Sequence, residues 1–102
     1  MTAQCPCKHL HPNKERSAEE ATRLIHRLNR IEGQIRGLKG MVEKQAYCID
    51  ILTQAAAASA ALHAFSRELL DSHIRSCVAS DLRAGRDETV DELLDTLRKF
   101  MK

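Results

Sequence analysis

Apolar residues recur in steps of three and four along the segment from residue 18 to residue 44. The series comprises Leu24, Leu28, Ile31, Ile35, Leu38 and Val42. This heptad-like spacing is typical of a long helix that packs along its length against another helix. Ser17 and Glu20 stand just before the series and form a capping box, which predicts that the helix begins at about Ala18.

A second long helix is predicted from about Cys48 to Leu82. A break near Gln45 precedes it, and Gly85 supplies a stop just after its end. Its apolar stripe continues to the far end of the helix and comprises Leu52, Leu62, Phe65, Leu69, His73 and Cys77. Residues 55–61 are alanine except for one serine, so another helix can approach closely here.

Three glycines interrupt the first predicted helix, at positions 33, 37 and 40. Each weakens a helix interior by up to about 1 kcal/mol relative to alanine. Gly33, Gly37 and Gly40 therefore predict a close backbone approach, either to a partner helix or to a phosphate.

A short third helix is predicted near the end of the chain. Thr89 and Glu92 form a second capping box, which marks its start. Its apolar face comprises Val90, Leu93, Leu94, Leu97 and Met101. No strand pattern competes with these three helices. The chain is therefore predicted to be all-α, with a flexible tail over residues 1–16 and one helical domain over residues 17–102.

Composition adds a need for partners. The chain has 102 residues and few aromatic side chains, so the core of a single subunit would be thin and oligomerisation is expected. The start lacks an apolar leader, and no apolar stretch is expected to approach the roughly 20 residues of a membrane span. A cytoplasmic protein without a membrane partner is expected. In that reducing compartment its four cysteines are expected to be ligands, sensors or buried thiols.

Cys48, His73 and Cys77 are the candidate metal ligands. His73 and Cys77 are four apart, so they fall on one face of the second helix. Cys48 precedes His73 by 25 residues, which is about 37 Å along a straight helix. One subunit cannot close this site, so a second subunit must supply the missing ligand.

Two thiolates and one imidazole favour a soft metal. They suit Cu(I) and Zn and disfavour Mg or Ca. Structural Zn almost always takes four protein ligands, and no fourth neighbour stands out, so three ligands fit Cu(I) better. In the plainer alternative the two cysteines are small buried apolar residues and His73 is a hydrogen-bonded core histidine. Cys5, Cys7, His9 and His11 in the tail could also capture metal or could do nothing.

Three ordered blocks resemble the CsoR-type family of copper-sensing bacterial repressors. They are RLNRIEGQIRG at residues 27–37, YCIDILTQ at 47–54 and LLDSHIRSCV at 69–78. The resemblance implies three helices per subunit, a dimer that forms an antiparallel four-helix bundle, and dimers paired into a tetramer. It also implies an intersubunit Cu(I) site in which Cys48 comes from one chain and His73 and Cys77 come from the other.

The same resemblance implies supporting residues around the metal. Family members place a Tyr beside the first Cys and a Glu on the last helix, and Tyr47 and Glu92 match these positions. Such groups fix the orientation of the ligands. The loop before the last helix is shorter here than in family members, and in the alternative Glu92 serves only as the acid of the capping box.

Operator DNA is the partner that the resemblance implies. The net charge is only +2, but basic residues gather on the first helix and acids gather between Asp81 and Asp95. A tetramer repeats the basic stripe across one face, which can contact phosphates without a helix-turn-helix. The candidates for DNA contact are Arg27, Arg30, Arg36 and Lys39, followed by Arg23, His63 and Arg67. In the alternative this stripe is only a solvated helix face.

The sequence thus predicts a Cu(I)-responsive repressor that is not an enzyme. It holds operator DNA without metal and releases it when Cu(I) binds. A persulfide or Zn sensor of the same fold stays open as an alternative. A thiol enzyme would need an exposed cleft, and a small copper carrier would place its ligands on an exposed segment such as the tail.

Overall fold

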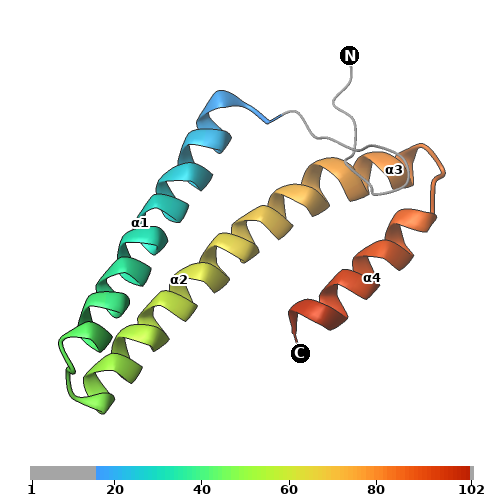
Figure 1. The fold of residues 1–102 in the computed structure, drawn as a ribbon. Helices are drawn as coiled ribbons and strands as arrows, with labels where there is room; N and C mark the ends of the chain where they lie inside the picture. The colour runs from blue at the N-terminus through green and yellow to red at the C-terminus, as the bar shows by residue number, and fades with distance from the viewer. Residues whose placement is uncertain (1–15, 102) are drawn as a thin grey trace. The chain divides into compact units, whose positions relative to one another are not determined.

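The computed structural model describes residues 16–101, and within them the chain is entirely helical apart from its turns. The elements are α1 (Ala18–Glu43), α2 (Cys48–His73), a π-helical turn η1 (Ile74–Val78), α3 (Ala79–Arg83) and α4 (Glu88–Phe100). Because α2, η1 and α3 run on as one helix to Arg83, the chain has the three predicted helices (Figure 1). The all-α prediction is confirmed. The tail residues Cys5, Cys7, His9 and His11 lie outside the described part.

Two compact units make up the described chain, and each is considered by itself. The first runs from Ser17 to Leu69 and the second begins at Leu70. The single domain predicted for residues 17–102 stays a prediction.

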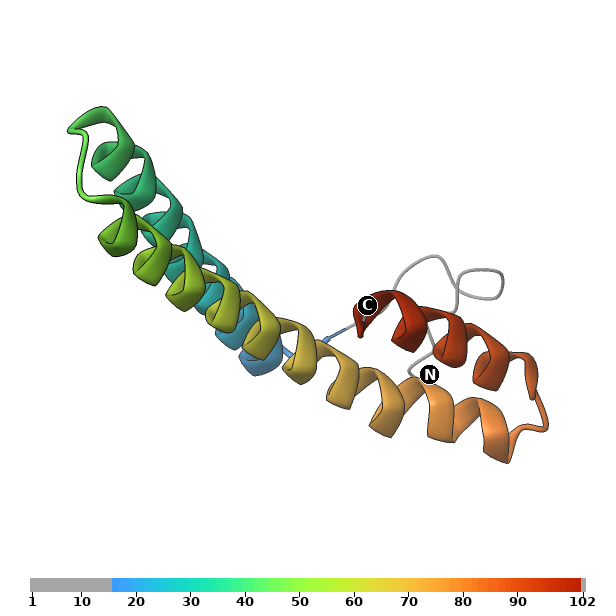
Figure 2. The ribbon, with the colours of Figure 1, turned by 90° about the horizontal axis from the view of Figure 1, so that it is seen from below.

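In the first unit, α1 and α2 lie side by side as an antiparallel hairpin, as Figures 1 and 2 both show. The predicted start of α1 is confirmed, because the Ser17 hydroxyl accepts a hydrogen bond from the Glu20 amide at 3.0 Å. Gln45 adopts a positive φ of 58° just after α1. This left-handed residue ends the helix and turns the chain toward α2.

Only half of the apolar seam of α1 is used within the subunit. Leu24 and Ile31 are buried, and Ala58 of α2 is buried in the same unit. The intervening seam residues remain exposed, with Leu28 at 37%, Ile35 at 46% and Val42 at 62%. These three residues, spaced seven apart, form the open seam. A heptad pattern that is half satisfied indicates a further helix supplied by another chain.

The α1 glycines do not mark a close approach within the subunit. A side chain added at Gly37 or Gly40 would meet nothing within 4 Å, and one at Gly33 would meet only the end of Arg36 at 3.9 Å. No close approach at these glycines occurs within the described part of the subunit, and an approach to a helix of another subunit or to a phosphate stays a prediction.

In the second unit, α4 runs back beside the end of the long helix (Figure 2). Gly85, with φ of 82°, ends α3 as predicted. The second capping box is wrong, because the N-cap residue is Asp87 and its side chain makes no capping bond. Thr89 lies inside α4 and is fully buried, with its hydroxyl donated to the Asp81 carboxylate. The Thr89 hydroxyl therefore bonds to the buried Asp81 and does not cap the helix as the local sequence pattern predicts.

The long helix also corrects an expectation about membranes. Cys48–Arg83 contains an 18-residue window with a mean hydropathy of 1.3, so one described helix is long and apolar enough to cross a membrane by length and composition alone. Its many alanines raise the hydropathy without adding large side chains. An apolar helix that packs in an oligomer passes the same test, so the absence of a membrane partner stays a prediction.

Candidate functional site

Cys48 and Tyr47 stand at the start of α2. Cys48 is the first residue of the helix and its thiol is exposed. Tyr47, which precedes it, is 69% exposed, and its carbonyl accepts the Ile51 amide at 3.1 Å. Both side chains of this pair are therefore open to a partner subunit.

His73 and Cys77 stand at the other end of α2. His73 is its last residue and is half-buried, whereas Cys77 lies in the π-helical turn and is 1% exposed. The Ser76 hydroxyl lies 3.7 Å from the Cys77 sulfur. A π-turn is wider than an α-turn, yet residues four apart still lie on nearly the same face. Such turns are frequent at functional sites.

No group of three His, Cys, Asp or Glu side chains that could hold a metal forms within residues 16–101 of one subunit. Cys48 begins α2 and His73 ends it. The donor set itself fits a soft metal, because it offers two thiols and one imidazole. That a second chain completes a site of these three ligands stays a prediction.

Glu92 lies in the second turn of α4 and is half-buried. It does not act with Thr89 as a capping box, because the N-cap residue of α4 is Asp87. The supporting roles of Tyr47 and Glu92 stay predictions.

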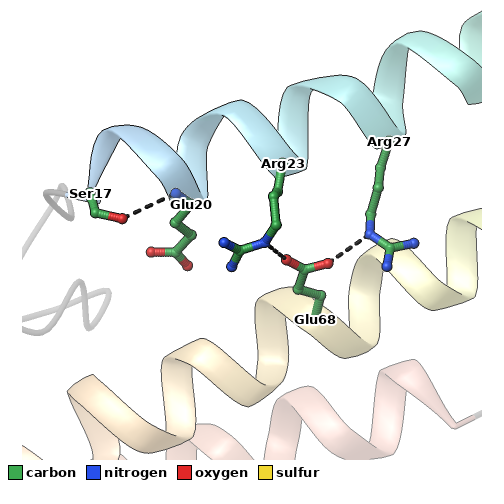
Figure 3. A network of polar contacts seen from close by, with 5 residues as sticks. All are labelled: Ser17, Glu20, Arg23, Arg27 and Glu68. Carbon is green, nitrogen blue, oxygen red and sulfur yellow. Dashed lines mark hydrogen bonds and ion pairs between the residues drawn. The ribbon is translucent and has the colours of Figure 1, made fainter.

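Two arginines of the basic stripe share one acid of α2. Arg23 Nε donates to Glu68 Oε2 at 3.0 Å and Arg27 Nε donates to Glu68 Oε1 at 2.6 Å, as Figure 3 shows. Glu68 is the least exposed of the three side chains, at 21% against 62% for Arg23 and 41% for Arg27. The carboxylate thus accepts one Nε–H from each guanidinium group, and both arginine side chains stay partly exposed.

The remaining DNA candidates do not all share that face. At about 100° per residue, Arg23, Arg27 and Arg30 lie within about 60° of one another around α1. Arg36 and Lys39 lie more than about 90° away from this group, nearer the open seam. Arg36 is 4.0 Å from Glu32. We call Arg23, Arg27 and Arg30 the basic face; His63 and Arg67 are exposed on α2.

Hydrogen bonds from Arg23 and Arg27 lower the pKa of Glu68 below its ordinary value of 4.5. A depressed acid pKa adds stability above the ordinary value, and this stability is lost as the pH falls through the lower folded-state value. Glu68→Gln should therefore flatten the fall in unfolding free energy below pH 4.5. Urea unfolding from pH 6 to about pH 3 measures this.

Glu32→Gln, which removes an exposed acid of α1, is the matched control and should retain the parent's pH dependence. If the unfolding free energy of the Glu68→Gln protein fell as steeply with decreasing pH as that of the parent, the Arg23–Glu68–Arg27 cluster would not stabilise the hairpin.

Residues 20–99 match the family described as metal-sensitive transcriptional repressors. The chain belongs to this family. The resemblance drawn from the three sequence blocks is confirmed, and the family is one of transcriptional repressors rather than enzymes.

Relatives within this repressor family have names that specify a metal. The copper-sensing transcriptional repressor CsoR of Bacillus subtilis is 43% identical over 88 residues, which cover 85% of this chain and 87% of that protein. The structure of the copper-sensing repressor CsoR with Cu(I) from Geobacillus thermodenitrificans is 45% identical, with a TM-score of 0.83, and the match covers 86% of this chain and 93% of that one. The nickel-responsive regulator InrS is 35% identical, with a TM-score of 0.69, over 88% of this chain and 99% of its own.

Several features of this repressor were not predicted. Glu68 bonds to arginines more than 40 residues earlier in the chain. The contact between Asp81 and Thr89 forms across a turn, and the π-helical turn is a matter of local helix winding. One usable signal was present for Glu68, because an antiparallel hairpin that turns near residues 45 and 46 places residues 23 and 68 opposite each other.

Proposed function

We propose that this family member is a Cu(I)-responsive repressor that holds operator DNA without metal and releases it when Cu(I) binds. The donor set carries the proposal, because two thiols and one imidazole are the ligands that Cu(I) prefers. The two copper-sensing repressors named above support it, at 43% and 45% identity against 35% for the nickel-responsive InrS. We further propose that it acts in the cytoplasm as a homodimer or homotetramer.

His73 and Cys77 of one subunit would hold Cu(I) together with Cys48 of the partner subunit. These residues would thus be joined across the two chains by coordination to one metal ion when Cu(I) is bound. Cys77 lies in η1, which leads directly into α3 and α4. A displacement of its thiolate toward a partner would therefore pass to α3 and α4, which belong to the same unit as Cys77. Tyr47 and Glu92 would steady the ligands from the start of α2 and from α4.

DNA phosphates are proposed to contact the basic face, and also Arg36 and Lys39. Arg30 forms no ion pair with the residues that the structure describes, and Lys39 is exposed. Metal and DNA then oppose each other through a coupling free energy that must be reciprocal. The repeated α1 helices of an oligomer would supply several phosphate contacts at once, so affinity should fall steeply with salt.

The test is fluorescence anisotropy of the reduced, anaerobic protein on DNA from upstream of its own gene. One equivalent of Cu(I) per subunit should weaken binding by at least about tenfold, a typical size for such coupling. Zn should fail to reproduce the effect. Tight DNA binding that ignores Cu(I) would overturn the copper proposal.

Two further outcomes identify the alternatives. Release by polysulfide, with modification of Cys48 and Cys77, would indicate a persulfide sensor, and release by Zn would indicate a Zn sensor. Loss of Cu(I) binding after deletion of residues 1–16, together with an absence of DNA binding, would indicate a carrier.

A further inference from the structure

The second unit contains three side chains that are almost completely buried. They are Cys77 at 1% exposure and Asp81 and Thr89 at 0%. One is a proposed metal ligand and the other two are polar. A buried carboxylate is costly unless it is hydrogen-bonded, so its contacts restrict where its neighbours can lie.

Asp81 joins the end of the long helix to α4. Its carboxylate accepts the Thr89 hydroxyl from α4, and it accepts Arg86 Nε at 3.2 Å and Nη2 at 2.7 Å from the connecting segment. Its carbonyl also accepts the Arg86 amide at 2.8 Å. We call Asp81, Arg86 and Thr89 the Asp81 clamp.

The clamp lies one helical turn from the proposed ligand. Cys77 and Asp81 are four apart, so they lie on one face of the helix, and Glu92 follows Thr89 by three on α4. Because α4 returns beside this helix (Figure 2), its turns lead from the clamp back toward the η1 region. The clamp therefore fixes the first turn of α4 to the same helix face that carries the thiol.

We propose that the Asp81 clamp is the positioning element that makes α4 follow a movement of Cys77, an inference that rests on the proposed function. A single helical turn is stiff, so Asp81 moves with Cys77. Hydrogen bonds to a buried acid have a fixed geometry, whereas apolar side chains can slide past one another. Without the clamp, α4 keeps its apolar contacts but no longer moves together with the helix that carries Cys77.

Thr89→Val tests this, because it removes the hydroxyl while nearly conserving volume. Thr96→Val is the matched control, since Thr96 is exposed and donates within its own helix to the Glu92 carbonyl at 3.0 Å. Asp81→Asn is the second variant, with Asp95→Asn of the exposed pair to Arg98 as its control. Arg86→Gln, at a half-buried position, keeps the test usable if the buried variants fail to fold.

Three quantities are measured for each protein. They are DNA affinity without metal, Cu(I) affinity by competition with a chromophoric chelator, and hydrogen exchange of α4 amides without metal. In Thr89→Val, DNA affinity without metal and Cu(I) affinity should each stay within about threefold of the parent. The factor by which Cu(I) weakens DNA binding should be about tenfold smaller than in the parent. Its α4 amides should exchange faster than the parent's. The controls should behave as the parent.

Each other outcome is decisive. Normal Cu(I)-dependent release by Thr89→Val and Arg86→Gln would overturn the clamp while leaving the repressor intact. A parallel loss of DNA affinity, Cu(I) affinity and stability would reduce the clamp to a folding role and would also overturn it. If the parent itself keeps its DNA with Cu(I) bound, the proposed function fails and the clamp proposal fails with it.

Discussion

Mixing two inactive variants should restore Cu(I) binding that neither has alone. One variant carries Cys48→Ser and the other carries both His73→Ala and Cys77→Ser. A serine hydroxyl is a poor ligand for Cu(I), so each variant alone should lose the site. In a two-fold dimer made from one of each, one of the two sites regains all three ligands. Random exchange should therefore recover about a quarter of the parent's Cu(I) capacity.

Cu(I) capacity is measured by chelator competition after the subunits are exchanged in mild denaturant and returned to native conditions. Both chains carry Cys5→Ser and Cys7→Ser, so the tail thiols cannot contribute. Each variant exchanged only with itself is the control. An absence of recovery, in a mixture shown by mass spectrometry to contain mixed dimers, would contradict the shared site.

Ile35→Glu should separate the subunits. Ile35 lies in the middle of the open seam and is 46% exposed in the lone subunit. If a partner helix covers this seam, the change buries one unpaired carboxylate from each chain, and each costs several kcal/mol. Sedimentation velocity should then show monomers at micromolar concentration. DNA affinity should fall at least about 100-fold, because an assembly with several phosphate contacts is lost.

Ile25→Glu is the matched control for that experiment. Ile25 has a similar exposure of 53%, but it lies about 80° around α1 from Ile35 and outside the open seam. The control should keep the parent's assembly. If Ile35→Glu also stayed assembled, the open seam would not be the interface between chains.

The helices could be predicted because their ends are marked locally. Ser17 caps α1 through the Glu20 amide, and Gly85 supplies the positive φ that ends α3. Thr89 carried an equally good local pattern, yet its hydroxyl bonds to Asp81, eight residues earlier. The four-residue pattern from Thr89 to Glu92 does not include Asp81, which the fold brings next to the hydroxyl.

The candidate site could be predicted only in part for similar reasons. The four-residue spacing of His73 and Cys77 shows in the sequence, but the π-turn that winds between them has no compositional mark. The apolar seam of α1 was visible as a heptad pattern, and only the structure separates the buried Leu24 and Ile31 from the open seam of Leu28, Ile35 and Val42. That division depends on where α2 packs. No single-residue property encodes it.

Newly synthesised subunits are expected to be degraded unless they assemble quickly. Only 6% of the apolar window in Cys48–Arg83 is buried within one chain. Chaperones and proteases act on chains that display such surface, so unpaired copies are expected to have short lifetimes. Since pairing depends on the square of concentration and degradation on its first power, removal dominates at low expression. A cell that makes this protein therefore has a minimum synthesis rate below which almost no working copies accumulate.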